Sequence, residues 1–306
     1  MKNVLSIYFE EDRIYLALLG HDTNGISLKK ISSLDESVDF ESYSLEDQTR
    51  ENILDWLSYY ATEADYITAT LPTDSVIVSQ MPADIDGEKE TLREVIKSEI
   101  TNTYPDFSPE NYVADIVKLV KPDSQDSEYV LSIIYASDII SNCINLLSPL
   151  GLDIQNVGIS QLNSHSAFFY NYPEYFDDSN IIIGVQEQFM DISIVRSGET
   201  IHYNLLSYNE VNDIPSIVEK SLSGFKEKYG EISNCMMFGK GLNKGILEGI
   251  KKRNLSGVNV ARLNAFRKVI PLVTDREKLY ASRTQHIFPP IIGSSFKPYS
   301  DVVRFI

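Results

Sequence analysis

The sequence predicts an α/β protein made of two similar halves. Apolar, β-prone runs alternate with amphipathic helical stretches along the chain, which is typical of sheets covered by helices. An apolar hairpin with a short polar turn opens near residue 3 and again near residue 180. The 306 residues, 43% of them hydrophobic, are enough for two cores. A duplicated α/β domain is the simplest explanation of this pattern.

The first half begins with a hairpin, in which two β-prone runs flank the charged turn Glu10-Glu11-Asp12-Arg13. A helix is expected over 52–64 because Ile53, Leu57 and Tyr60 share one face. The polar and acidic residues 33–49 favour a loop. The expected strands of this half are 4–9, 14–19, 26–31 and 66–71.

A compact strand-helix-strand-strand module is expected next, over residues 75–136. Its helix, 87–103, has a charged face opposite an apolar stripe formed by Leu92, Val95, Ile96 and Ile100, and Tyr104-Pro105 ends it. We interpret the stripe as a face that packs on the core, with the wall of a peptide groove as the alternative. The expected strands are 75–81, 111–120 and 129–136, the last two joined by the polar loop 121–128.

The remaining chain repeats the alternation. The expected helices are one capped by Asp138, then 160–170, 211–229 and 243–252. The expected strands are 153–157, 180–185, 190–195, 200–206, 233–238 and 259–263. The final forty residues, 267–306, give a mixed pattern. We therefore place one domain at 1–172, with the module at 75–136 inserted in it, and a second at 173–306, whose last residues are free to return to the first.

The composition excludes some functions. A net charge of −17, from 44 acidic and 27 basic residues, disfavours nucleic acid as a partner. Cys143 and Cys235 form no disulfide framework and are expected to be reduced. The N-terminus is not a signal peptide, and no stretch reaches the ~18 apolar residues of a membrane span. We expect a cytoplasmic protein.

No catalytic residue or metal ligand is expected. The four histidines, His21, His165, His202 and His286, show no metal-ligand spacing, and the motifs of a nucleophile elbow and a P-loop are absent from the sequence. A basic cluster at 251–253, with Arg262, Arg267 and Lys268 nearby, is interpreted as a solvated face. Contact with an acidic partner or with lipid headgroups is the alternative.

Three segments resemble the PilM family. Residues 66–107 contain a strand ending in Leu71-Pro72, a strand ending in Met81-Pro82 and an acidic helix ending near Tyr104-Pro105. Residues 131–168 and 218–245 continue the match in order and spacing. The resemblance implies two actin-like (ribonuclease H-like) domains around a nucleotide cleft, with an inserted strand-helix-strand-strand subdomain. FtsA and the cytoplasmic part of GspL proteins are similar in build.

The resemblance also implies a cytoplasmic scaffold, which reaches a membrane only through its partner. In type IV pilus machines PilM holds the cytoplasmic tail of an inner-membrane assembly protein. We expect such a tail as the partner here, and self-association remains an open option because actin relatives polymerise.

The phosphate-binding loops of the family are altered in this chain. PilM proteins carry Asp-Ile-Gly in both hairpins, where Gly lets backbone N–H groups approach phosphate oxygens. Here Ser6 and Tyr8 occupy these positions in the first hairpin, and Gly184 and Gln186 in the second. Asp12 and Asp191 are the substitutes considered as metal ligands, although exposed turn and strand acids are the simpler interpretation. The family's Gly-Gly pair is also missing, since the chain has Asn209-Glu-Val-Asn-Asp213 there.

A third motif of the family is present in this chain: Gly239-Lys240-Gly241 follows an expected strand. The resemblance implies that it lies against the adenosine, and that Glu219 and Lys220 contact the base and ribose, if a nucleotide is bound. A tight strand-to-helix turn is the alternative. The leading hypothesis is thus a pseudo-ATPase scaffold without a cofactor. The alternative is an ATP-binding or slowly hydrolysing switch that uses Mg-ATP; a small-molecule kinase would need a metal-binding Asp that the first hairpin lacks.

Overall fold

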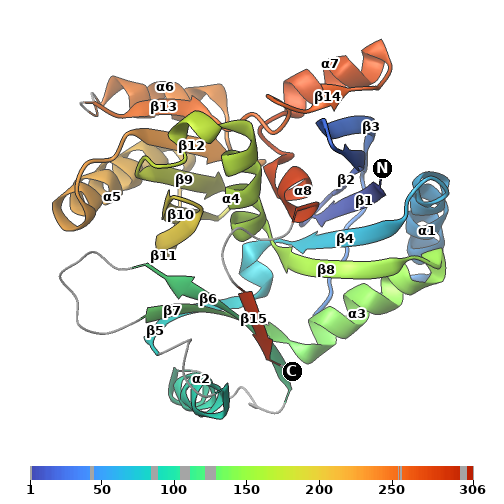
Figure 1. The fold of residues 1–306 in the computed structure, drawn as a ribbon, viewed down its shortest axis with the longest axis horizontal. Coiled ribbons are helices and arrows are strands. Elements are labelled where there is room, and N and C mark those ends of the chain that lie inside the picture. Colours follow the sequence, from blue (N-terminus) through green and yellow to red (C-terminus); the bar gives the residue numbers. More distant parts are fainter. Residues whose placement is uncertain are drawn as a thin grey trace.

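The computed structural model describes residues 2–41, 45–83, 89–103, 111–120, 129–253, 255, 257–296 and 302–305. They form two β-sheets with helices packed on both faces (Figure 1). The α/β class expected from the sequence is therefore confirmed. Several expected features fall outside the described residues: the start of the module's helix at 87–88, its end at Tyr104-Pro105, and the loop at 121–128.

The first sheet has the strand order β14-β3-β2-β1-β4-β8. Strands β1, β2 and β3 are antiparallel neighbours, and β4 and β8 run parallel to β1. Both faces of β1 and β2 are covered, so these strands are continuous apolar runs rather than alternating ones. The bounds are β1 Lys2–Phe9, β2 Ile14–Asp22, β3 Gly25–Leu34, β4 Tyr66–Leu71, β8 Asp153–Ile159 and β14 Ile270–Pro271.

Helices cover both faces of this sheet. Helices α1, Asp47–Ala61, and α3, Ser137–Leu147, pack on one face, and α4, Ser160–Asn171, and α8, Pro289–Ser294, pack on the other. Helix α8 crosses α4 so closely that a Cβ on Gly293 would lie 1.6 Å from the carbonyl oxygen of Asn163. Residues 264–296 thus belong to the core of the first sheet, although they follow the second half in sequence.

The second half repeats the strand arrangement of the first. Its order β13-β12-β9-β10-β11 matches β8-β4-β1-β2-β3, with the hairpin strands again antiparallel and the next two parallel. Helices α5, Ile214–Tyr229, and α6, Lys244–Lys252, cover one face, while Phe168 and Phe169 of α4 pack on the other. Helix α4 therefore lies between the halves. The strands are β9 Asn180–Val185, β10 Phe189–Arg196, β11 Glu199–Ser207, β12 Asn234–Phe238 and β13 Asn259–Arg262.

The inserted module has the expected order β5, α2, β6 and β7. Leu92, Ile96 and Ile100 of α2 are buried against the strands, which supports the core-facing interpretation of the stripe. One residue pair, Thr200 and Leu119, joins β11 to β6 in parallel, so the module abuts the second half. The bounds are β5 Ile77–Pro82, α2 Lys89–Thr103, β6 Tyr112–Leu119 and β7 Tyr129–Ala136.

The chain's last described strand, β15, Val302–Phe305, also belongs to this module. It pairs antiparallel with β6 along residues 114–117, far in sequence from the rest of the module (Figure 1). The edge of β6 therefore accepts an extended segment. None of the helices among the described residues is both long and apolar enough to cross a membrane.

Some expected boundaries were wrong. The loop expected at 33–49 instead includes the end of β3 and the first turn of α1, and the helix expected at 211–229 begins at Ile214 after a 3₁₀ turn. Helices α7, Asp275–Thr284, and α8 lie in the region without expected elements. Helix α7 begins with a capping box formed by Thr274 and Glu277, and α8 begins with two prolines, which suit the first turn of a helix.

Candidate functional site

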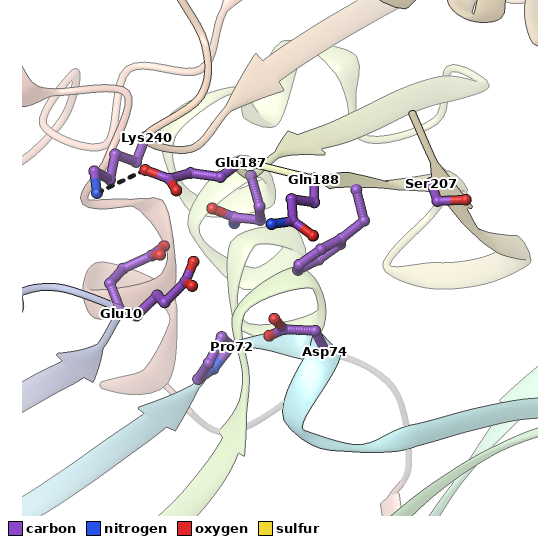
Figure 2. Close-up of a pocket in the computed structure, with 10 residues that line it drawn as sticks. Glu10, Pro72, Asp74, Glu187, Gln188, Ser207 and Lys240 are labelled. Carbon is purple, nitrogen blue, oxygen red and sulfur yellow. Dashed lines mark hydrogen bonds and ion pairs between the residues drawn. The ribbon is translucent and has the colours of Figure 1, made fainter. Parts of the chain in front are cut away.

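A cavity of about 300 Å³ lies where the turns of the two hairpins face each other. The first turn contributes Glu10 and Glu11, and the second contributes Gln186, Glu187 and Gln188. Figure 2 shows that Lys240 and Glu187 lie at one side of the cavity, across from Glu10, while Asp74 closes the opposite side. The ten lining residues are Glu10, Glu11, Pro72, Asp74, Gln186, Glu187, Gln188, Phe189, Ser207 and Lys240.

Lys240 connects the two halves at this cavity. Its Nζ lies 2.5 Å from Oδ1 of Asp12 in the first turn and 3.2 Å from Oε1 of Glu187 in the second. Partial desolvation lowers the pKa of Lys240, but the hydrogen bonds to Asp12 and Glu187 outweigh it and raise the pKa above its usual value. Lys240 therefore stays protonated and forms ion pairs with both turns.

A second, buried contact joins the turns. The Tyr8 hydroxyl donates to the carboxylate of Glu10, and Nε2 of Gln186 donates to Oη of Tyr8 at 3.4 Å. Tyr208 donates in turn to the carbonyl oxygen of Gln186. Burial raises the pKa of Glu10 to about 7, against the opposing effects of Tyr8 and Lys240. Glu10 is 7% exposed, so its carboxyl lies within the contact between the two turns.

Asp191 lies on β10, outside the set of cavity-lining residues. Its side chain is fully buried, so the expectation of an exposed acid is wrong for Asp191, whereas Asp12 is exposed. Its Oδ1 accepts a hydrogen bond from the Tyr203 hydroxyl at 2.5 Å. Complete burial raises the pKa of Asp191 to about 7, although the hydroxyls of Tyr203 and Thr73 act in the opposite direction. Asp12 is paired with Lys240, and Oδ1 of Asp191 is bound by Tyr203. Among the described residues, no group of three or more His, Cys, Asp and Glu side chains is placed to hold a metal ion.

Gly239 and Gly241 pack against the second hairpin. The φ of Gly239 is 104°, and a Cβ there would lie 2.3 Å from the carbonyl oxygen of Val185. The N–H of Gly241 donates to that oxygen at 2.9 Å, and a Cβ on Gly241 would lie 2.4 Å from the carbonyl oxygen of Gln186. Close backbone contact with the end of β9 requires both glycines. This contact explains the motif as a tight strand-to-helix turn that projects Lys240 toward the cavity.

The other two residues expected near a nucleotide lie elsewhere on the second half. Glu219, on α5, forms an ion pair with Arg253 at the end of α6. Lys220 is exposed on the same helix. The fold thus brings Lys240 to the cavity but neither Glu219 nor Lys220.

Sequence reasoning missed several lining residues. Asp74 follows the Leu71-Pro72 strand end, Glu187 and Gln188 lie in the second turn, and Phe189 begins β10, so their positions at strand ends were the available signal. Their convergence depends on how the halves pack together. What the site offers chemically is a desolvated carboxyl, an ammonium group and several hydrogen-bonding side chains.

No protein-family model and no curated protein matches the sequence. Solved structures match over nearly the whole chain. PilM in the PilM–PilN type IV pilus biogenesis complex superposes with a TM-score of 0.69 at 13% identity, covering 95% of this chain and 96% of that one. A Bacteroides thetaiotaomicron protein of unknown function with an actin-like ATPase fold gives 0.54 at 12% identity, covering 85% and 91%.

This chain therefore has the actin-like fold, in the arrangement that PilM also shows. The fold class expected from the resemblance is confirmed. The cavity between the hairpin turns lies where the resemblance places the phosphates.

Proposed function

We propose that this protein is a non-catalytic actin-like scaffold, which holds the cytoplasmic tail of an inner-membrane assembly protein in a pilus- or secretion-type machine. The observation that carries the proposal is the Lys240 bridge. The chain's own ammonium group and carboxylates line the cavity between the hairpin turns, where the resemblance places phosphates.

The charges at the cavity oppose a polyphosphate. Glu10, Glu11, Asp74 and Glu187 line it, and Lys240, the one cation among the described lining residues, is already paired with two carboxylates. Each carboxylate about 4 Å from a phosphate oxygen would repel it by roughly 1 to 4 kcal/mol at dielectrics between those of water and a protein surface. A nucleotide would have to overcome this repulsion and also displace Lys240 from Asp12 and Glu187. The scaffold therefore works without ATP or Mg²⁺.

The inserted module supplies the surface for the tail. Strand β15 pairs with β6, so the edge of this sheet accepts an extended segment in antiparallel register. Strand addition of this kind gives affinity through main-chain hydrogen bonds. PilM was solved in complex with PilN, and we transfer a partner of that kind to this chain. The tail would replace β15 on β6 and tie the scaffold to the cytoplasmic face of the membrane.

Binding to synthetic peptides tests this proposal. The probes are the cytoplasmic tails of the inner-membrane proteins encoded beside this gene, immobilised for interferometry against the full chain. One tail should bind, and a variant lacking 75–136 should not bind it. Capture by that deletion variant would contradict the proposal.

A second variant keeps the proposal testable if the variant lacking 75–136 does not fold. Truncation after residue 296 removes β15 and frees the edge of β6, so the same tail should bind roughly 3-fold tighter or better, because the competent state is more populated. Unchanged affinity would exclude strand addition at β6.

A further inference from the structure

We propose that the edge of β6 selects a tail whose strand reads apolar-apolar-basic-apolar, and that Asp115 is the residue that selects the basic position. The inference rests on the strand addition proposed above and names the chemistry of the partner. A tail that replaces β15 has to match the same edge of β6. The register of β15 on that edge therefore shows what each position of the tail requires.

The register assigns one residue of the added strand to each residue of the edge. The pairs, each with the β15 residue first, are Val302 and Val117, Val303 and Ile116, Arg304 and Asp115, and Phe305 and Ala114. Side chains at directly opposite positions of an antiparallel pair lie on the same face of the sheet. The chemistry of each β6 residue thus determines which residue suits the position opposite it.

Three of these four positions on β6 favour apolar partners. Ala114 and Ile116 belong to the apolar cluster that β6 shares with Leu92 and Ile96 of α2. Val117 lies on the other face, in the core of the first half. All three are 0% exposed, so a polar residue opposite them would lose its contact with water without gaining a partner. A tail should therefore carry apolar residues at these positions.

The fourth position is a carboxylate within the same buried edge. Asp115 is 5% exposed, on the face of β6 that also carries Val117. Opposite charges directly across an antiparallel pair stabilise it, whereas like charges destabilise it. The β15 residue at the opposite position is Arg304. The same requirement applies to a tail, so Lys or Arg is favoured there over a neutral residue, and Asp or Glu is the least favoured.

The tail of an inner-membrane protein suits this requirement. Cytoplasmic segments next to membrane spans carry an excess of Lys and Arg. The net charge of this chain, −17, attracts basic segments in general. Asp115 converts this attraction into a preference for one register, because a shift of the tail by one residue moves its basic residue opposite Ile116 or Ala114.

Peptide binding to the chain truncated after residue 296 tests the inference. The probe is the chain's own segment 298–306 with a fluorescent label, so no knowledge of the tail is needed. We expect saturable binding in fluorescence anisotropy. The same peptide with Arg304→Glu should bind roughly 10-fold more weakly, because an opposite-charge pair becomes a like-charge pair. Equal affinity of the two peptides, or no saturable binding of the first, would overturn the inference.

Asp115→Asn in the truncated chain separates a specific pair from general charge attraction. In this variant the preference for the unmodified peptide over the Arg304→Glu peptide should fall to roughly 3-fold or less. The control, Asp55→Asn, removes one charge at an exposed position of α1 and should keep the full preference. An equal loss of preference in both variants would show that net charge, rather than Asp115, makes the selection, and would overturn the inference.

Hydrogen exchange in the full-length chain gives a second measurement that needs no truncation. Arg304→Glu should weaken the pairing of β15 with β6, so amides within residues 114–117 should exchange roughly 10-fold faster. Arg283→Glu makes the same charge change at an exposed position of α7 and should leave these amides unaffected. Unchanged exchange at 114–117 in the Arg304→Glu variant would contradict the inference.

The failure of this inference is distinguishable from the failure of the proposed function. If a tail that contains no Lys or Arg binds the edge of β6, the inference is overturned and the scaffold stands. If the 298–306 peptide binds with the expected preference but no inner-membrane tail binds, the inference is supported and the scaffold is contradicted.

Discussion

Lys240 places its Nζ 2.5 Å from Oδ1 of Asp12, although the two residues belong to different halves of the chain. The same ammonium group contacts Glu187 in the second hairpin turn. One side chain thus joins two turns that, by the resemblance to PilM, would each bind phosphate. This ammonium group therefore links the two halves of the chain at the cavity.

Replacing Lys240 tests this link. Lys240→Met should lower the free energy of unfolding by about 1 kcal/mol, because partly exposed ion pairs contribute little individually. In that background Asp12→Asn should have little further effect, which a double-mutant cycle from urea unfolding would detect. The control is Lys244→Met, which removes a more exposed pair with Glu248 within α6. Strictly additive effects of Lys240→Met and Asp12→Asn would contradict the link.

The glycine turn should be intolerant of side chains. Gly241→Ala would place a Cβ 2.4 Å from the carbonyl oxygen of Gln186 and should destabilise the chain by about 2 kcal/mol or more. Gly224, on the exposed face of α5, is a matched control because a Cβ there meets nothing within 4 Å. Gly224→Ala should stabilise by up to ~1 kcal/mol through helix propensity. Thermal unfolding of both variants checks this, and equal effects would refute the packing role of Gly241.

Stability should fall as pH rises from about 4.5 to about 7. Burial raises the pKa of Glu10 to about 7, so in this window the folded chain holds a proton that the unfolded chain has lost. Tyr8 and Lys240 favour the charged form, while Asp74 and Asp12 disfavour it. Glu10→Gln should remove the loss of stability that deprotonation of Glu10 causes, which is at most about 3 kcal/mol.

The measurement is the urea midpoint at pH 5 and pH 8. Glu10→Gln should be nearly neutral at pH 5 and stabilising at pH 8, with Glu51→Gln on the exposed face of α1 as the charge control. Asp191 is also buried, and its pKa is also raised to about 7. The stability of the Glu10→Gln variant should therefore still decrease somewhat between pH 5 and pH 8. A Glu10→Gln effect that is the same at both pH values would contradict the burial of this carboxyl.

The two thiols report on the two cores separately. Cys143 lies on α3 in the first core and Cys235 on β12 in the second, and burial raises the pKa of each to about 12. Native protein should therefore react with a thiol reagent only as fast as each core opens. Labelling of Cys143→Ser and Cys235→Ser variants in increasing urea gives the order of opening. Immediate labelling of either thiol without urea would contradict its buried position.

The repeated hairpins and the inserted module could be predicted because each depends on local patterns. The stripe of α2 follows the 3.6-residue period, and the strands of the module are bounded by proline or by polar runs. Helix α8 could not be predicted in this way. The mixed pattern of residues 267–306 predicts no element there, whereas Pro289-Pro290 suits the start of a helix and Gly293 lets α8 approach α4.

The cavity was only partly predictable. The sequence shows that Tyr8 and Gln186 depart from the glycines of the family, but not that they meet across 178 positions of chain. The burial of Glu10 likewise depends on the packing of two halves, which no local pattern encodes. The resemblance implies that Lys240 lies near a nucleotide only if one is bound, and its place beside Asp12 emerges only in the folded chain.

Isothermal titration of the full chain with Mg-ATP tests the central claim most directly. If the acidic lining and the Lys240 ion pairs exclude phosphates, no saturable heat should appear up to ~1 mM nucleotide, a limit that corresponds to about 4 kcal/mol of binding free energy. Saturable binding of one Mg-ATP per chain at micromolar affinity would contradict the claim. The Lys240 bridge would then be a closed form that nucleotide opens, and the switch hypothesis would replace the scaffold.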